Sequence, residues 1–481
     1  MTDHNASETS LFEQCGYSRE AIQARLERNW YEMFEGPDKI YWENDEGLGY
    51  VMDTGNHDVR TEGMSYAMMI AVQYGRKDVF DKLWGWVMKY MFMTEGLHQG
   101  YFAWSVDPSG VPNADGPAPD GEECFAMDLF LASAQWGDGE GVYEYSRHAR
   151  SILHTCVHQG EDGEGYPMWN PENHLIKFIP ETEWTDPSYH LPHFYEVFAE
   201  RADEADRPFW AQAAKASREY LVTACHPQTG MNPEYSNYDG TPHVDERDHW
   251  HFYSDAYRTA GNIGLDCLWN GVVPDLCDAN ARLQRFFLEH DRTCVYAIDG
   301  TPVDETVLHP VGFIAATAEG SLAAMHSQEP DALDNAIRWV RLLWDTPIRT
   351  GTRRYYDNFL YAFAFLALAG GWANPFRRVP IGERIGKEDA HEEVRGVVGS
   401  RTVPVSRYRG RNENRRMTKE DYERYLHDNG WRQGRETSRN HIGGRRRGDA
   451  AAAGVRPDGH GGRPRLSGRH QGRIQSANTI R

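Results

Sequence analysis

Three carboxylic acids that lie far apart in the sequence each stand at the start of a segment rich in Ala, Gly and aromatic residues. They are Glu62, Asp120 and Asp255. Paired carboxyl groups can cleave a glycosidic bond, because one protonates the leaving oxygen while the other activates water or attacks carbon. Aromatic faces such as that of Trp104 complete the set that polysaccharide chemistry needs. The residue types therefore indicate this chemistry, provided that the fold brings the acids together.

Further polar residues stand at the starts of other segments of this kind: Tyr189 and His190, Arg258, and His309. Taken singly, each has a simpler structural explanation. An acid at a helix start usually caps the helix or complements its dipole, and a Tyr or His is more often a hydrogen-bonded core residue. Their shared position at segment starts is what favours a common site.

Two kinds of helix alternate along the body of the chain. Amphipathic helices are expected to begin near Ser18, Asp78, Tyr143, Pro208, Ala281 and Asp331. The helices between them are rich in Ala, Gly, Met and aromatics, and some are apolar nearly all round, which is typical of buried helices. These run from about Glu62, Cys124, Tyr189, Ser254, Val311 and Tyr356.

The alternation predicts an all-α fold, a closed (α/α)6 barrel of six inner and six outer helices. An open helical solenoid would show a tighter repeat length and capping units. In a closed barrel the inner helices point the same way, so their N-terminal ends converge on one face. We therefore expect Glu62, Asp120 and Asp255 to meet at one mouth of the barrel, with short strands such as 101–105 and 294–298 in the connecting loops.

Charge divides the chain into two unlike parts. The first 400 residues carry 31 Lys and Arg against 64 Asp and Glu, whereas the remainder carries 20 against 8. An acidic body repels nucleic acid and anionic membranes, and it suits a neutral substrate such as a sugar. We expect a catalytic domain over residues 1–380 and a basic, Arg/Gly-rich, largely disordered tail over 381–481. Arg/Gly tracts can bind RNA, but the preferred interpretation is an extension without function.

Cofactor and targeting signals are missing from the sequence. The seven cysteines form no C-x-x-C pair and are expected to be reduced thiols. No signal peptide or membrane-spanning run is visible, which predicts a cytoplasmic protein without membrane contact. Asp248, His249 and His251 lack further metal ligands at suitable spacing, and no phosphate loop or dinucleotide fingerprint occurs. We therefore expect no metal and no cofactor.

The chain resembles glycoside hydrolase family 8 and, within it, the members that release xylose from the reducing end of short xylo-oligosaccharides. The resemblance spans roughly residues 10–375. It implies an (α/α)6 barrel, inverting hydrolysis and a xylo-oligosaccharide substrate; a monomer is expected. The segments that carry it are DTGNHDVRTEGMSYAMM (53–69), GPAPDGEE (116–123), DPSYHLPHFYEVFA (186–199), NPEYSNYDGTP (232–242), HFYSDAYRTAGNIGLD (251–266), LHPVGFIA (308–315) and RRYYDNFLYAFAF (353–365).

By position, the resemblance implies roles for five residues. Glu62 matches the family's general acid and Asp255 its general base. Asp120 matches the carboxylate that binds the sugar beside the cleavage point, and Tyr189 the tyrosine that orients the attacking water. His309 lies in the loop that shortens the reducing-end side of the cleft in exo-acting members.

Two physical requirements follow from these roles. A helix N-terminus favours the ionised form of an acid, which suits Asp255 but opposes proton donation by Glu62. We therefore expect desolvation by the bound sugar and repulsion from the nearby Asp120 to raise the pKa of Glu62. We also expect acid and base to stand about 6.5–9.5 Å apart. Arg258 and Trp104 are expected to contact the substrate at the same mouth.

Other functions remain open at this point. An endo-acting xylanase, glucanase or chitosanase of the same family is one alternative. The wider family often has Asp-Gly-Asp where this chain has Asp120-Gly121-Glu122, which argues against a generic endoglucanase. A catalytically silent carbohydrate-binding barrel is another alternative, and the presence of all three acids argues against it.

Overall fold

The computed structural model describes residues 10–245, 249–372 and 374–376. Within these ranges the protein is rich in helix, and its short strands form two-stranded antiparallel sheets. The tail expected at 381–481, and the boundary that precedes it, lie outside the described residues. No helix in the described ranges combines the length and the hydropathy that a membrane span needs.

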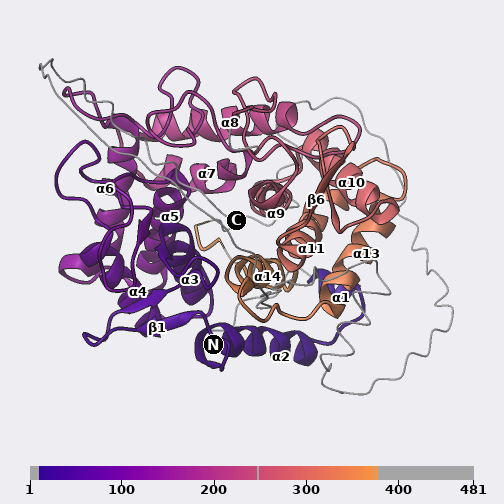
Figure 1. Cartoon of the computed structure of the whole chain (residues 1–481), viewed down its shortest axis with the longest axis horizontal. Coiled ribbons are helices and arrows are strands. Elements are labelled where there is room, and N and C mark those ends of the chain that lie inside the picture. Colours follow the sequence, from indigo (N-terminus) through magenta and orange to yellow (C-terminus); the bar gives the residue numbers. More distant parts are fainter. Residues whose placement is uncertain (1–9, 246–248, 373, 377–481) are drawn as a thin grey trace, which may run out of the picture. The chain divides into compact units, whose positions relative to one another are not determined.

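In the described part of the chain, six helices form an inner ring (Figure 1). Each contacts the next in sequence order, and the last contacts the first. In the last of them every residue after Arg354 is buried, as expected for a helix that is apolar on all sides. The six are α3 (Thr61–Gln73), α5 (Pro119–Trp136), α7 (Pro192–Arg201), α9 (Arg258–Asn270), α11 (Pro310–Glu319) and α14 (Arg354–Leu368).

A second set of helices alternates with the inner ones along the chain and packs on their outer side. These helices are amphipathic, and each buries one apolar stripe. They are α2 (Arg19–Trp30), α4 (Lys77–Tyr90), α6 (Tyr145–His158), α8 (Arg207–Ala224), α10 (Pro274–Glu289) and α13 (Ala332–Asp345). Two single-turn helices, α1 (Leu11–Gln14) and α12 (Ser321–Ala324), complete the α-helices of the described residues.

Two helices start earlier than the apolar pattern predicts. Helix α5 begins at Pro119 instead of Cys124, so Asp120 lies within its first turn and not before it. Helix α10 begins at Pro274 instead of near Ala281. In both cases a proline occupies the first helical position, where its missing N–H has no intrahelical partner to lose. The buried pattern marks where a helix enters the core, and the proline marks where it begins.

Two inner helices start later than expected. Tyr189 lies in a separate 3-10 turn, Pro187–Tyr189, and α7 begins only at Pro192. Asp255 lies in the 3-10 turn Ser254–Tyr257, which leads into α9. A single 3-10 turn buries side chains at nearly the same spacing as the first turn of an α-helix, so sequence periodicity does not separate the two.

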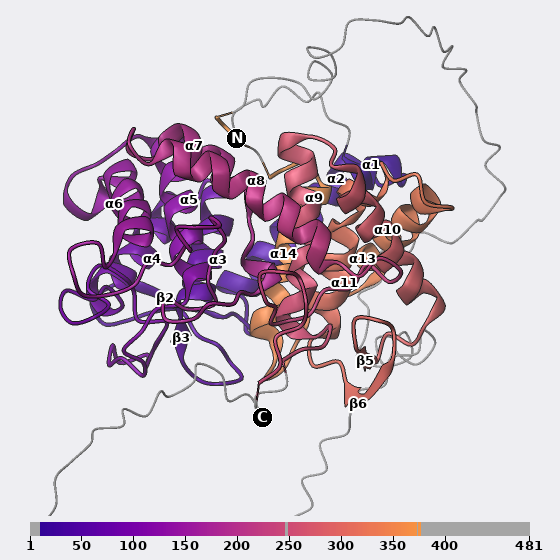
Figure 2. The ribbon, with the colours of Figure 1, turned by 90° about the horizontal axis from the view of Figure 1, so that it is seen from above.

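The strands lie in loops along one side of the helices, as Figure 2 shows for β2, β3, β5 and β6. The pairs are β1 (Tyr41–Glu43) with β2 (Gly49–Val51), β3 (Val59–Arg60) with β4 (Ser105–Val106), and β5 (Cys294–Tyr296) with β6 (Pro302–Thr306). Strand β4 shares only Ser105 with the strand expected at 101–105, whereas β5 is a shorter form of the strand expected at 294–298. Strand β3 runs directly into α3, so its pairing with β4 fixes the backbone just before Glu62.

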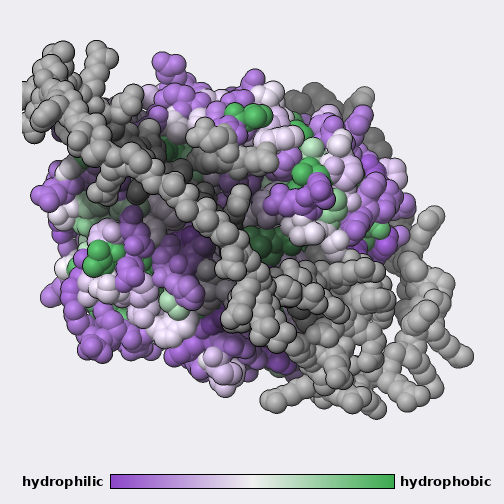
Figure 3. Space-filling model, viewed as in Figure 1, coloured by the Kyte–Doolittle hydropathy of each residue, from purple (hydrophilic) through white to green (hydrophobic). Residues whose placement is uncertain are grey.

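The coloured surface in Figure 3 is mainly hydrophilic, and its hydrophobic spots are small and separate. Exposed large hydrophobic side chains such as Val111, Val244 and Leu333 come from different parts of the described chain. Scattered apolar side chains of this kind are normal on soluble protein surfaces. All seven cysteines are free thiols, as expected.

The close approach of α3 and α5 depends on a glycine. A Cβ atom built on Gly121 would lie 2.5 Å from the Cβ atom of Thr61 and 2.6 Å from its Oγ1 atom. The missing side chain therefore lets the first turn of α5 lie against the first turn of α3. This contact brings Asp120 next to Glu62.

We expect Gly121→Ala to lower the free energy of unfolding by about 1–3 kcal/mol, because a methyl group forced into a filled contact must displace one of the two helices. Scanning calorimetry measures the change. The matched control is Gly116→Ala, since a Cβ atom there would meet no atom closer than 3.5 Å. Equal losses of stability in the two variants would contradict the role given to Gly121.

Candidate active site

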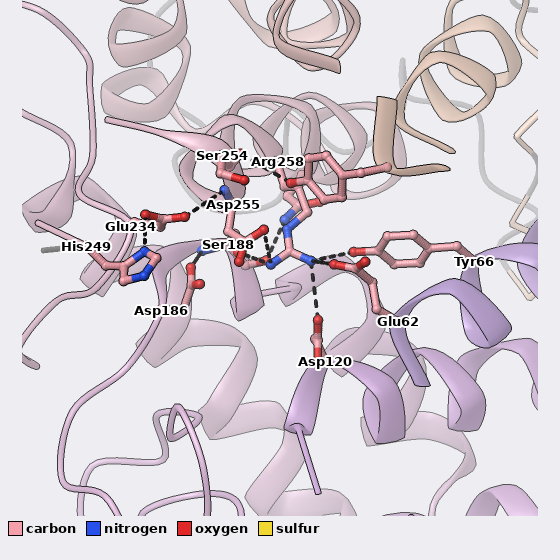
Figure 4. A network of polar contacts seen from close by, with 12 residues as sticks. Glu62, Tyr66, Asp120, Asp186, Ser188, Glu234, His249, Ser254, Asp255 and Arg258 are labelled. Carbon is pink, nitrogen blue, oxygen red and sulfur yellow. Dashed lines mark hydrogen bonds and ion pairs between the residues drawn. The ribbon is translucent and has the colours of Figure 1, made fainter. Parts of the chain in front are cut away.

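The side chain of Arg258 lies at the centre of a buried polar network (Figure 4). Its Nη1 atom donates to Glu62 Oε2 at 3.2 Å and to Asp120 Oδ2 at 3.3 Å. The Nη2 atom lies 3.6 Å from Asp255 Oδ1. The hydroxyl of Tyr66 accepts a shorter bond from Nη1, at 2.6 Å. One guanidinium thus joins all three acids that the sequence singles out.

The elements that carry these residues explain why they meet. Glu62 is the second residue of α3, Asp120 is the second residue of α5, and Arg258 is the first residue of α9. Ser188 Oγ, from the turn before α7, accepts a bond of 2.8 Å from Arg258 Nη2. The N-terminal ends of four neighbouring inner helices therefore contribute to one site.

Burial and charge give the carboxyl groups different proton affinities. Burial is the main cause that raises the pKa of Glu62, to about 8; Asp255 and Asp120 raise it further, while Arg258 opposes them. Burial also raises the pKa of Asp120, to about 6, against the pull of Arg258. The helix dipole was expected to favour the ionised form of Glu62, but the effect of burial is larger. Glu62 therefore keeps its proton near neutral pH.

Two neighbouring contacts fix the backbone at Asp255, whose side chain forms no helix-capping hydrogen bond. Its N–H donates to Glu234 Oε1 at 3.3 Å, and Glu234 Oε2 lies 2.6 Å from His249 Nδ1. The preceding Ser254 has a φ of 36°, a strained conformation for a residue with a side chain, and its carbonyl accepts a bond from the Tyr356 hydroxyl. A strained turn fixed from two sides thus sets the direction of the Asp255 side chain.

Tyr189 packs beside the central arginine. The Cζ atom of Arg258 lies 5.6 Å from the centroid of the Tyr189 ring. Burial raises the pKa of Tyr189 well above its ordinary value, so its hydroxyl remains a proton donor. In the same turn, Asp186 Oδ1 accepts the N–H of Ser188 at 2.7 Å, and burial raises the pKa of Asp186 as well.

His309 occupies the position just before α11 and is tied to α14. Its Nδ1 atom lies 2.8 Å from Asp357 Oδ2, and its ring lies 4.7 Å from the ring of Tyr356. Burial alone would raise the pKa of Asp357, but Arg349 and His309 hold it below its ordinary value. Because Arg258 Cζ lies 6.0 Å from the same Tyr356 ring, His309 stands one aromatic ring away from the central arginine.

Trp104 contacts the two residues that precede Glu62, Arg60 and Thr61. Its carbonyl accepts the N–H of Thr61 at 3.0 Å, and its ring lies 5.4 Å from Arg60 Cζ. The two expected site residues His309 and Trp104 are therefore adjacent to the network around Arg258, while neither bonds to that arginine directly.

Sequence reasoning missed several members of the network: Tyr66, Ser188, Asp186 and Glu234. Tyr66 could have been inferred from the sequence, since it lies four residues after Glu62 and hence on the same helix face. Glu234 lies in the segment 232–242 that carries the family resemblance, but no periodicity marks it, because it lies in a loop and bonds to Asp255 across 21 residues. Of the suggested metal cluster, Asp248 lies outside the described residues, and His249 is bonded to Glu234.

The N-terminal ends of the inner helices gather three carboxyl groups around a single arginine, and one of these groups, that of Glu62, keeps its proton near neutral pH. This arrangement defines an acid–base hydrolase of the carbohydrate-cleaving class. The family model of the glycosyl hydrolases family 8 matches residues 21–367. The chain belongs to this family.

Relatives of known activity agree with this assignment. A reducing-end xylose-releasing exo-oligoxylanase from Bifidobacterium adolescentis is 73% identical over 361 residues, which cover 75% of this chain and 95% of the relative. A protein of the same name from Halalkalibacterium halodurans is 56% identical over 368 residues, with coverages of 76% and 93%. A solved structure of a mutant reducing-end xylose-releasing exo-oligoxylanase complexed with xylobiose is 55% identical, has a TM-score of 0.74, and covers 77% of this chain and 98% of its own. The chain is a glycosidase.

Proposed function

We propose that this chain is a reducing-end xylose-releasing exo-oligoxylanase that hydrolyses short xylo-oligosaccharides with inversion at the anomeric carbon. The observation that carries the proposal is the joint contact of Glu62, Asp120 and Asp255 with Arg258, together with the raised pKa of Glu62. The name and the inverting course come from the family and from the relatives that share most of the chain. The ring of helix pairs is, in this proposal, a complete (α/α)6 barrel.

In the proposed reaction Glu62 donates its proton to the glycosidic oxygen as the bond from that oxygen to the anomeric carbon breaks. Asp255 removes a proton from a water molecule, whose oxygen attacks the anomeric carbon from the opposite face. The Tyr189 hydroxyl orients this water. The products are free xylose and a shortened chain of inverted configuration, and proton exchange with solvent restores both carboxyl groups.

The remaining residues bind and position the substrate. Asp120 accepts hydrogen bonds from the sugar on the non-reducing side of the cleaved bond. Arg258 keeps the three acids at fixed positions and limits their mutual repulsion, because a buried charge needs a partner. Trp104 offers an aromatic face to a sugar ring. No step of this reaction calls for a metal or an organic cofactor.

The exo restriction is assigned to His309. Its Nδ1 atom is engaged by Asp357, so the ring is held firmly while Nε2 has no hydrogen-bond partner among the described residues. Arg349 donates to the carbonyl of Leu308 at 2.8 Å and also contacts Asp357, which fixes the loop. A rigid imidazole at this position can bond a hydroxyl of the leaving xylose and block the space of a second sugar beyond it.

We expect xylotriose to yield xylose and xylobiose, and xylotriitol to resist cleavage, because reduction opens the terminal ring and removes the hydroxyl contacts at its anomeric carbon. His309→Ala should weaken this distinction. Mass and NMR analysis of the products measures both the cleavage position and the anomer first formed. Efficient cleavage of xylotriitol or of polymeric xylan by the intact enzyme would favour the endo-acting alternative.

The proposed catalytic domain comprises residues 1–380, in line with a family match that ends at residue 367. We expect removal of residues 383–481 to leave xylotriose hydrolysis and the melting temperature unchanged. Gel-shift titration with RNA, run on the full and the shortened chain, tests the alternative that the Arg/Gly-rich tail binds nucleic acid. A marked fall in melting temperature after truncation would mean that the tail belongs to the folded domain.

We further propose a monomer that acts in the cytoplasm. The scattered exposed apolar side chains support the first point, because a stable dimer interface needs a contiguous patch. The short substrate supports the second, since short oligomers can be imported and polymeric xylan cannot. Light scattering and cell fractionation test the two points separately.

A further inference from the structure

We propose that His154, His158 and Asp206 form a binding site for one divalent transition-metal ion of the zinc type, outside the catalytic site, which links helix α6 to the start of helix α8. The three residues gather ligand atoms that all lie within 4.8 Å of one another. None of them contacts the network around Arg258 in the described structure. The site is therefore assigned a stabilising role and no part in hydrolysis.

The two histidines lie one turn apart on the same face of α6, and their ring centroids are 4.4 Å apart. Asp206 immediately precedes α8 and faces both of them. Its Oδ2 atom lies 3.0 Å from His154 Nδ1, and its Oδ1 atom lies 2.9 Å from His158 Nε2. Ligands at about 2.0–2.2 Å from a tetrahedral zinc ion stand about 3.3–3.6 Å from one another. The three ligand atoms, which lie within 4.8 Å of one another, must therefore draw closer to bind the ion.

The two ring nitrogens of His158 face two different carboxylates, which is compatible with a metal ion on the side of Asp206. Its Nδ1 atom lies 2.7 Å from Glu161 Oε1, while its Nε2 atom faces Asp206. Without a metal, a protonated imidazole can donate to both carboxylates; with a metal ion at Nε2, the single remaining ring proton is directed at Glu161. With the proton directed at Glu161, the lone pair of Nε2 points at Asp206. A metal-bound histidine commonly has this arrangement, in which a carboxylate holds the second ring nitrogen.

The position of Asp206 is not explained by helix capping. It occupies the N-cap position of α8, yet its side chain makes no cap hydrogen bond. The side chain is only 3% exposed, and both of its oxygens are directed at the histidines. An aspartate is seldom buried so fully without a charged partner. The two histidines, and not helix capping, account for the burial and the orientation of this carboxylate, which is therefore already directed at the nitrogens that a metal ion would share with it.

The surroundings fit a site that exchanges metal with solvent. The side chain of His154 is 57% exposed, which leaves room for entry and for a water molecule as a fourth ligand. Arg150 of α6 also contacts Asp203, three residues before Asp206, at 3.5 Å, which is a further contact between these segments that needs no metal. Two imidazole nitrogens and one carboxylate suit Zn²⁺, Co²⁺ or Ni²⁺ better than the all-oxygen shell of Ca²⁺ or Mg²⁺.

The test uses the full chain, freed of metal with a chelator and dialysed. We expect Zn²⁺ titration calorimetry to detect one site that is lost in His158→Ala and in Asp206→Asn, and an affinity that is about 10-fold lower in Glu161→Gln. Zn²⁺ should raise the melting temperature of the wild type by about 2–5 °C and leave that of His158→Ala unchanged. Co²⁺ should give the intense visible absorption of a tetrahedral site in the wild type and not in His158→Ala or Asp206→Asn.

The matched control is His148→Ala, which removes another histidine of α6 that bonds only to the carbonyl of Gly141. It should bind Zn²⁺ as the wild type does. If Asp206→Asn fails to fold, His154→Ala at its exposed position serves in its place. Zn²⁺ binding that persists unchanged in His154→Ala and His158→Ala, or an absence of binding in the wild type, would overturn the site. Xylotriose hydrolysis should be equal with and without Zn²⁺, and a strict metal requirement would contradict the stabilising role.

Discussion

Replacing Glu62 by glutamine should lower the rate of xylotriose hydrolysis by about 10²–10⁴-fold, the range that general acid catalysis contributes. The amide keeps the size of the side chain and can still contact Arg258, but it has no acidic proton to give to the leaving oxygen. The loss should fall on kcat more than on KM, because proton donation matters in the transition state. Initial rates and circular dichroism on the same samples separate chemistry from folding.

A substrate with a good leaving group makes this prediction sharper. Fluoride needs far less protonation than a sugar oxygen, so Glu62→Gln should keep much of the wild-type rate on β-xylobiosyl fluoride while remaining poor on xylotriose. Glu20→Gln is the control, since Glu20 also lies in the first turn of a helix but is exposed on α2. A variant that is equally impaired on both substrates would contradict the acid role.

The pH dependence of the wild type follows from the same group. Because burial raises the pKa of Glu62 to about 8, the proton needed for catalysis is retained through neutral pH and lost as the pH rises past that value. The alkaline limb of kcat/KM for xylotriose should therefore fall near pH 8, and this limb reports the free enzyme. It should be absent when Glu62→Gln hydrolyses the fluoride.

Replacing Asp255 by asparagine should cause a loss of similar size, about 10²–10⁴-fold. The amide cannot accept a proton from the attacking water, although the backbone bond from residue 255 to Glu234 remains possible. In contrast to the acid variant, this one should be impaired on xylotriose and on β-xylobiosyl fluoride alike, because both need an activated water. The two variants are thus distinguished by one pair of substrates.

Asp275→Asn is the matched control for the base. Asp275 lies in the first turn of the outer helix α10 and is exposed, so its replacement removes a carboxylate from a helix start without touching the site. We expect wild-type rates for it on both substrates. Substantial xylotriose hydrolysis by Asp255→Asn would mean that another carboxylate, such as Asp186 or Glu234, serves as the base.

Much of the fold could be predicted from local sequence because helices bury their residues with a short period. The apolar pattern and the alternation of two helix types located all twelve helices of the double ring in the described chain. Helix boundaries were less predictable. With Pro119 at its first position, α5 begins earlier in the chain than the apolar pattern predicts. The 3-10 turns at Tyr189 and Asp255 make two other helices begin later, because the conformation of a single turn depends on its tertiary contacts as well as on its own residues.

The sequence by itself determined which acids stand at inner-helix starts, since that is a matter of position along the chain. Only the tertiary structure decided what those acids can do. The bonds from Arg258 to Glu62 and Asp120 span 196 and 138 residues, and the high pKa of Glu62 arises from burial that no local segment provides. Likewise, the spacing of His154 and His158 within one helix is local, whereas Asp206 becomes their partner only through folding. Charge interactions and desolvation depend on distance in space, and distance in space is fixed only when the helices have packed.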